Sequence, residues 1–159
     1  MGFRTIRKIL GIILYVFGIF AAAWLIVHFV AQRTVVDGSS METTLNDGDN
    51  LIIDKISYRF EDPKRFDIIV FPFQYKENTF YIKRIIGLPG ETVSITDNGI
   101  IMINGEPLQE SYGKEVIRDP GSAKDPITLK DGEYFVLGDN RNNSSDSRDP
   151  SVGIIKRSD

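Results

Sequence analysis

Few residues in this 159-residue sequence are suited to chemistry, and their types limit the reactions available. There is no cysteine, which excludes disulfides, thiol catalysis and cysteine-based zinc sites. The single histidine, His28, lies inside an apolar segment, so no Ser-His-Asp triad can form outside that segment. Any nucleophilic catalysis in the rest of the chain must therefore use a base other than histidine.

Lys83 is a candidate for that base. If residues 81–86 form a strand, Tyr81, Lys83 and Ile85 share one face and Arg84 lies on the other, so at most one of the two basic residues can face solvent. Desolvation among Ile and Tyr lowers the pKa of a lysine from about 10.4. A neutral amine can then act as a general base toward a serine hydroxyl. A lysine that reaches out to solvent is the alternative that this stretch leaves open.

Two further segments carry candidate groups. Ser40 lies in the tetrapeptide 38–41 (GSSM), where a serine can be a nucleophile or simply part of a turn. The segment 138–148 reads GDNRNNSSDSR and follows a short apolar run. It does not fit an EF-hand calcium loop, because counting from Asp139 puts arginine at the third position and serine at the sixth, where glycine is required. Its aspartates and arginines are expected to form internal ion pairs that make a rigid wall.

The sequence that must position these groups predicts a compact, mostly antiparallel β domain. Asn98-Gly99 and Asn104-Gly105 flank a short apolar run, and Asn-Gly is the strongest short hairpin signal. Pro89-Gly90 predicts a type II turn, and residues 118–126 are expected to form a surface loop. The expected strands are runs rich in Ile, Val, Phe and Tyr, at residues 51–53, 67–71, 80–86, 92–95, 100–103 and 134–137.

Residues 9–31 form an apolar segment without any charged residue, in which Gly11, Gly18 and His28 accompany 20 apolar residues. As a helix, such a segment is about 34 Å long and can cross a hydrocarbon core of about 30 Å. The segment therefore predicts a transmembrane anchor. A cleaved signal peptide with its small residues at 21–23 and a buried core helix are the alternatives. His28 is expected to be a polar residue at the membrane interface.

The charge distribution predicts the orientation of the anchor. Arg4, Arg7 and Lys8 precede it, whereas Arg33 is the only basic residue shortly after it. The positive-inside rule then makes residues 1–8 a cytoplasmic tail and places residues 32–159 outside the cell membrane, in a single-pass protein. Residues 32–159 hold all 22 acidic residues and 16 of the 19 basic ones, a net charge of −6. This acidic part argues against a nucleic-acid partner, which needs a basic face.

Three motifs, taken together and in order, resemble those of the type I signal peptidases, also called leader peptidases. They are GSSMETTL at residues 38–45, KRIIGLPG at residues 83–90, and the segment 138–148. The chain is most similar to the short Gram-positive form of this family, and the resemblance covers nearly its whole length, anchor included. Three separate motifs in the family's order are highly specific, although any one of them alone is not.

The resemblance implies a role for each matched residue. Ser40 matches the nucleophile and Lys83 its general base, while Ser144 matches a serine whose hydroxyl helps to orient the lysine. Met41 matches a residue that packs at the site, and the Ser40 N–H would supply part of an oxyanion hole. Gly38 stands where some relatives add a serine hydroxyl to that hole, so backbone donors should matter more here. The positions that brace the site are matched by Asp139, Arg141, Asp146 and Arg148.

The resemblance also implies a coiled antiparallel β-sheet fold shared with the LexA-type self-cleaving repressors, and a Ser-Lys endopeptidase that needs no cofactor or metal. Its expected partners are the lipid bilayer and the signal peptides of exported preproteins, cut after a small-x-small motif. A catalytically silent relative that assists assembly of surface pili is the alternative function. A LexA-type DNA-binding regulator is opposed by the anchor and the acidic domain.

The sequence departs from the family pattern in three places. Thr43 stands where proline is usual, which is expected to loosen the loop after the nucleophile. Phe66 stands where glycine is common. The sequence ends at Asp159, where relatives continue into a further strand, so either a naturally short form or a fragment is expected.

Overall fold

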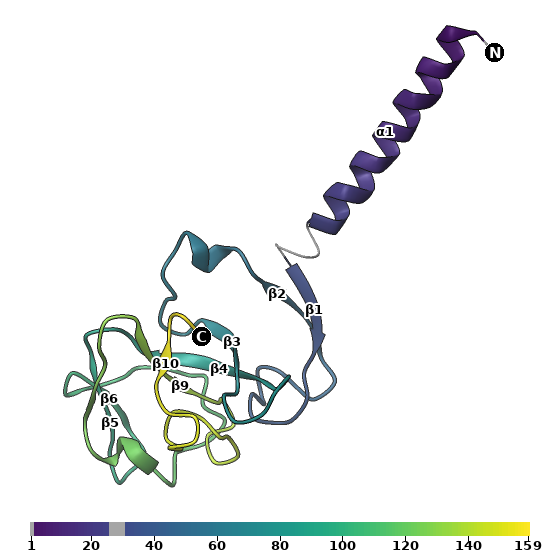
Figure 1. Ribbon diagram of the computed structural model, residues 1–159. Helices are drawn as coiled ribbons and strands as arrows, with labels where there is room; N and C mark the ends of the chain where they lie inside the picture. The colour runs from purple at the N-terminus through teal and green to yellow at the C-terminus, as the bar shows by residue number, and fades with distance from the viewer. Residues whose placement is uncertain (1, 26–30) are drawn as a thin grey trace. The chain divides into compact units, whose positions relative to one another are not determined.

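The computed structural model describes residues 2–25 and 31–159 (Figure 1). The chain forms two compact units. The first unit comprises Met1–Thr34 and Asn50–Asp62, and the second comprises Val35–Asp49 and Pro63–Asp159. His28, predicted at the membrane interface, lies outside the described residues together with the rest of 26–30, which belong to the anchor expected at 9–31.

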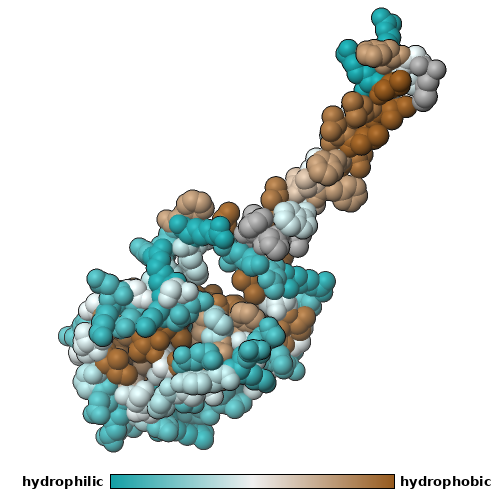
Figure 2. Space-filling view, viewed as in Figure 1, coloured by the Kyte–Doolittle hydropathy of each residue, from teal (hydrophilic) through white to brown (hydrophobic). Residues whose placement is uncertain are grey.

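The first unit consists of one apolar helix and a small sheet. Helix α1 (Phe3–Leu25) begins before the uncharged segment, which starts at residue 9. The helix can include Arg4, Arg7 and Lys8 because arginine and lysine are good helix formers. None of its residues is buried, unlike those of a core helix, and its surface is largely apolar (Figure 2). Its 23 residues span about 34 Å, which is consistent with a membrane anchor. After it, strand β1 (Ala31–Val35) pairs with β2 (Asn50–Asp54), and the 3₁₀ turn η2 (Ser57–Arg59) follows.

The second unit contains two antiparallel sheets, so the prediction of a mainly antiparallel β domain is confirmed. One sheet has the strand order β10-β9-β4-β3, and the other has the order β7-β6-β5-β8. Their bounds are β3 (Ile68–Pro72), β4 (Phe80–Gly87), β5 (Thr92–Ile95), β6 (Ile101–Ile103), β7 (Glu106–Pro107), β8 (Ile127–Thr128), β9 (Glu133–Leu137) and β10 (Ile155–Lys156), with the 3₁₀ turn η3 (Gly121–Lys124) before β8.

The predicted turns are confirmed. Between β6 and β7, Asn104 and Gly105 have φ angles of 54° and 84°, as a type I′ hairpin turn requires. At Gly90 the φ angle is 81°, and the Glu91 N–H donates to the Leu88 carbonyl, as in a type II turn. The surface loop expected at residues 118–126 is exposed over most of its length. This segment includes η3, and Ala123 within it is fully buried in the core.

Strands β4 and β9 lie between two hydrophobic clusters. Ile86, Phe135 and Leu137 belong to the cluster that includes residues of the second sheet, whereas Ile85 and Val136 belong to the other. The last five residues of β4 are all buried, because its two faces are both covered. This double coverage explains how consecutive basic side chains on opposite faces of β4 can both be removed from solvent.

Candidate active site

Ser40 and Lys83 meet in the second unit, although 43 positions separate them. Lys83 Nζ lies 2.8 Å from Ser40 Oγ and 2.9 Å from the Ile82 carbonyl oxygen. Lys83 is only 3% exposed, so the alternative of a lysine that reaches solvent is wrong. Burial lowers the pKa of its amine to about 8, against an opposing effect of the Asp146 carboxylate. The amine can therefore be neutral near pH 8 and within hydrogen-bond distance of a serine hydroxyl.

The loop that carries Ser40 is a tight turn built on its own backbone. The Glu42 N–H donates to the Ser39 carbonyl, and the Met41 carbonyl accepts two further N–H groups of the turn. Met41 is 2% exposed, so its side chain anchors the loop in the interior. At Gly38 the φ angle of 101° requires glycine, and its N–H donates to the Asp47 carboxylate. The loop thus enters and leaves the site in a fixed conformation.

Asn140 holds this loop against the segment 138–148. Its backbone N–H donates to the Ser40 carbonyl at 3.0 Å, and its side-chain amide donates to the Ser39 carbonyl at 3.0 Å. Asn140 was not among the residues predicted from the sequence, although it follows Asp139 in the segment 138–148. Its amide can donate without carrying a charge, but Asn142 and Asn143 share this property, so residue type alone did not mark it.

Asp139 links the same segment to β4 and to the loop of Ser40. The Arg84 guanidinium donates two hydrogen bonds to the Asp139 carboxylate, from Nε to Oδ1 at 2.9 Å and from Nη2 to Oδ2 at 2.6 Å. Thr44 Oγ1 donates to Asp139 Oδ2 at 2.5 Å. Asp139 is fully buried and Arg84 is 4% exposed. A buried pair with these extra hydrogen bonds fixes the position of β4 relative to both segments.

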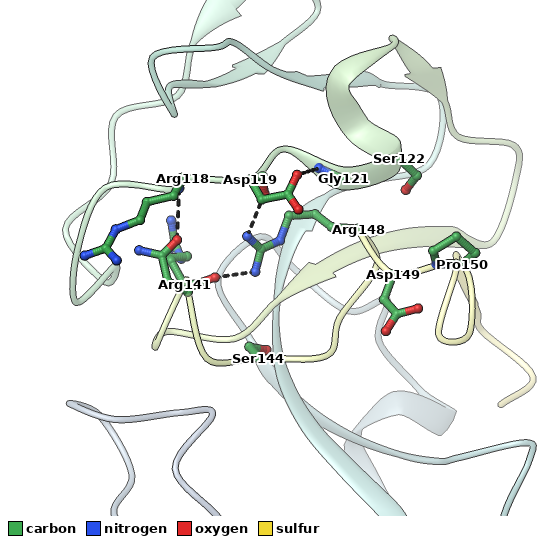
Figure 3. Close-up of a pocket in the computed structure, with 10 residues that line it drawn as sticks. Arg118, Asp119, Gly121, Ser122, Arg141, Ser144, Arg148, Asp149 and Pro150 are labelled. Atoms are coloured by element: carbon green, nitrogen blue, oxygen red, sulfur yellow. Dashed lines mark hydrogen bonds between the residues drawn. The ribbon is translucent and has the colours of Figure 1, made fainter.

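Asp146 and Arg148 form the second buried pair, with two contacts of 2.8 Å between guanidinium and carboxylate. Arg148 also donates to the Arg141 carbonyl at 2.5 Å and to the Asp119 carbonyl at 3.2 Å (Figure 3). The expectation of internal ion pairs is therefore correct for this pair. It was wrong for Asp139 and Arg141, because in the folded chain their nearest opposite charges come from other segments.

Ser144 lies beside the site, but its hydroxyl makes no hydrogen bond with the lysine amine in this structure. Its Oγ is buried and has no hydrogen-bond partner among the described residues. A Cβ atom at Gly138 would lie 2.2 Å from that oxygen and 2.5 Å from the Ser40 carbonyl oxygen, so only glycine fits there. Ser144 also lines a cavity of about 650 Å³ together with Arg141 and Arg148 (Figure 3). Its role in orienting Lys83 stays a prediction.

Phe66, at the position where the resemblance suggests glycine, has a backbone conformation that glycine favours. Its φ angle of 74° lies in the left-handed region, which glycine adopts without steric cost. Here the phenylalanine ring instead packs against the core and against the ring of Tyr112, at a centroid distance of 5.0 Å. Within the described part of the chain, no group of three or more His, Asp or Glu side chains could hold a metal ion.

Comparisons with known proteins agree with this geometry. Residues 9–159 match the family model of the signal peptidases, peptidase S26. The probable signal peptidase I-1 of Synechocystis is 42% identical over 132 residues, which is 79% of this chain and 65% of that protein. Signal peptidase I of Bacillus licheniformis is 37% identical over 142 residues, 85% of this chain and 75% of that protein.

A solved structure also matches: a signal peptidase I from Enterococcus faecalis V583, 37% identical, superposes with a TM-score of 0.50 over 62% of this chain and 92% of that chain. The chain spans 55% to 65% of the length of the Synechocystis and Leptolyngbya relatives that it matches. The family match nevertheless covers residues 9–159, which include Ser40, Lys83 and all the buried pairs around them. The chain belongs to the signal peptidase family, peptidase S26.

Proposed function

We propose that this chain is a membrane-anchored serine endopeptidase that removes signal peptides from exported preproteins. The observation that carries the proposal is the 2.8 Å separation of Ser40 Oγ from the amine of Lys83, which is buried and has a pKa lowered to about 8. A lysine in this state can take the proton of a serine hydroxyl at the pH of a living cell, which an ordinary surface lysine cannot.

In the proposed mechanism, the neutral Lys83 amine accepts the hydroxyl proton as Ser40 Oγ attacks the scissile carbonyl carbon. The Ser40 backbone N–H donates to none of the described residues in this structure, and it is proposed to stabilise the oxyanion. The Lys83 ammonium then returns the proton to the leaving amine, and an ester with Ser40 remains. Water, deprotonated by Lys83, cleaves that ester and regenerates both groups.

The substrate is proposed to bind as an extended strand beside the first half of β4. Strand β9 pairs with β4 only from Arg84 onward, so on that side Phe80–Lys83 have no neighbouring strand among the described residues. The segment 36–38 before the nucleophile is the second candidate edge. A peptide paired there would present its carbonyl to both Ser40 and Lys83. Alternate residues of a strand point the same way, so positions −1 and −3 would enter pockets together.

This binding mode can be tested with a peptide library based on a signal-peptide cleavage site. Bulky residues at −1 or −3 should abolish cleavage, because both side chains enter small pockets, whereas −2 should tolerate most residues. A flat preference at −1 and −3, or a strict one at −2, would rule out the edge-strand pose.

The nucleophile is tested by cleavage of a signal-peptide substrate by the full chain in detergent. Ser40→Ala should reduce the rate at least about 10³-fold, because the covalent step is lost. Ser39→Ala is the matched control, since it removes the neighbouring hydroxyl, which among the described residues accepts a hydrogen bond from Asn143 alone. Full activity of Ser40→Ala would reject the proposed mechanism. The catalytically silent alternative predicts no cleavage by the unmodified chain.

A further inference from the structure

We propose that residues 110–114, called here the 110–114 strap, are a positioning element that holds Ser40 in reach of Lys83. None of the three sequence motifs includes this segment. In the structure it contacts all three of them through separate side chains. The inference rests on the proposed peptidase function for its kinetic consequences, but its geometry does not depend on that function.

Tyr112 connects the strap to β4. Its ring lies under the guanidinium of Arg84, with 3.8 Å between the guanidinium carbon and the ring centroid. Arg84 immediately follows Lys83, and its guanidinium grips Asp139 on the segment 138–148. A stacked ring restricts the guanidinium to the plane in which both hydrogen bonds to the carboxylate can form. The Tyr112 ring also packs against the Phe66 ring, which restricts its position.

Glu110 connects the strap to the segment 138–148. Its carboxylate lies 2.7 Å from Arg141 Nη1, and both side chains are largely buried. Burial alone would raise the pKa of Glu110, but the hydrogen bond and charge of Arg141 hold that pKa below its usual value. A Cβ atom at Gly113 would lie 3.0 Å from the same guanidinium, so the strap backbone also packs directly on Arg141. Arg141 is thereby enclosed between the strap and its own loop.

Lys114 connects the strap to the loop of the nucleophile. Its amine lies 2.8 Å from the carboxylate of Glu42, two positions after Ser40, and its backbone N–H donates to the Asp139 carbonyl at 2.8 Å. The Glu42 pair is partly exposed, so by itself it contributes little free energy. The pair matters because of its position: it links the strap directly to the turn that carries Ser40.

These contacts form a closed frame around the reacting atoms. Arg84 adjoins Lys83 on β4 and binds Asp139. Asp139 and Thr44 in turn connect β4 to the nucleophile loop, and the strap contacts all of these segments. Loosening the strap should let Ser40 Oγ drift from Lys83 Nζ without altering the strand edge proposed to bind substrate. Because a displacement of about 1 Å at reacting groups can cost about 10²-fold in rate, the effect should appear in kcat and not in KM.

The test compares Tyr112→Leu, which removes the stacked ring, with Tyr112→Phe, which keeps it, in the full chain in detergent. For each variant we would measure kcat and KM on a signal-peptide substrate, the melting temperature, and the pKa of Lys83 by NMR of labelled lysines. The control is Ile127→Ala, since Ile127 packs against the core from β8 and makes none of the strap contacts described above. It is expected to destabilise the fold and to leave those contacts in place.

Tyr112→Leu should lower kcat by roughly 10-fold or more with KM unchanged within about twofold, and raise the Lys83 pKa as water reaches the amine. Tyr112→Phe should restore most of kcat, and Ile127→Ala should lower only the melting temperature. The proposal is overturned if Tyr112→Leu keeps both kcat and the Lys83 pKa, or if Ile127→Ala loses kcat equally. If the unmodified chain cleaves no substrate, the proposed function is wrong. The positioning role of the strap is then tested by the Lys83 pKa alone, compared between Tyr112→Leu and the unmodified chain.

Discussion

Lys83 combines a charge-bearing side chain with a position that disfavours charge. It is 3% exposed and lies in the half of β4 that is covered on both faces. Desolvation outweighs the attraction of Asp146, so its pKa falls from 10.5 to about 8. The Asp146 charge is itself engaged by Arg148 at 2.8 Å, which limits how far it can raise the pKa of the amine. Two consequences at the residue scale can be measured.

The first concerns the pH dependence of cleavage. Because only the neutral amine can accept a proton, kcat/KM should rise about tenfold per pH unit below pH 8 and level off above it. The measurement is a rate profile between about pH 6 and 10. Lys83→Arg should lose about 10²–10⁴-fold at every pH, because a guanidinium stays protonated. Substantial activity in that variant would mean that the base lies elsewhere.

The second concerns stability. An unfolded chain keeps Lys83 protonated up to its ordinary pKa, so between pH 8 and 10.5 the unfolded state binds more protons and folding becomes more favourable as pH rises. The fall from 10.5 to about 8 corresponds to about 3 kcal/mol of destabilisation near pH 7. Lys83→Met should therefore increase the free energy of unfolding by about that amount at pH 7. Denaturant unfolding should show this gain shrinking toward pH 10.5, and a gain independent of pH would contradict it.

At the scale of elements, the two sheets depend on a close approach at Gly87, the last residue of β4. A Cβ atom there would lie 2.4 Å from Val93 Cγ2 and 3.0 Å from Phe135 Cβ. These atoms belong to β5 in the second sheet and to β9 in the first. Glycine thus lets the second sheet pack on β4 only four positions after Lys83.

Gly87→Ala should destabilise the protein by about 1–3 kcal/mol, because the added methyl group has no space. Thermal or denaturant unfolding measures this loss. The matched control is Val93→Ala, alone and combined with Gly87→Ala, since it removes the nearest clashing atom. The double variant should be more stable than the sum of the single effects by about 1 kcal/mol. Strict additivity would show that the clash with Val93 is not the cause.

At the scale of the whole molecule, charge and hydropathy are divided along the chain. All three basic residues of the first 31 positions precede position 9, and all 22 acidic residues follow position 31. Helix α1 buries none of its residues and presents an apolar surface, which is consistent with an anchor (Figure 2). From the positive-inside rule we propose a cytoplasmic N-terminus, with residues 32–159 on the outer side.

The absence of cysteine allows a direct measurement of this orientation, because each introduced thiol is the only one. In intact cells, a maleimide that cannot cross membranes should label Ser158→Cys and leave Thr5→Cys unlabelled. Both variants should react after detergent lysis, which controls for accessibility of each site. Labelling of Thr5→Cys in intact cells would invert the proposed topology.

The sequence by itself determined the features that depend on local chemistry. Asn-Gly and Pro-Gly pairs marked turns because they adopt backbone angles that few other residues tolerate, and the structure has turns at those positions. Alternation along residues 81–86 placed Lys83 and Arg84 on opposite faces, and uncharged apolar length marked the anchor helix. The three motifs supplied the family, which the comparisons confirm.

Only the tertiary structure decided how these segments are held together. The partner of Asp139 is Arg84, 55 positions away, and the partner of Arg141 is Glu110, 31 positions away, whereas the sequence suggested pairs within one loop. Asn140, Tyr112 and Lys114 gained their contacts in the same way. Ion pairs and ring contacts form with whichever group the folded chain brings near, and burial of both faces of β4 arises from packing. Such proximity depends on the path of the whole chain, which residue type and spacing do not encode locally.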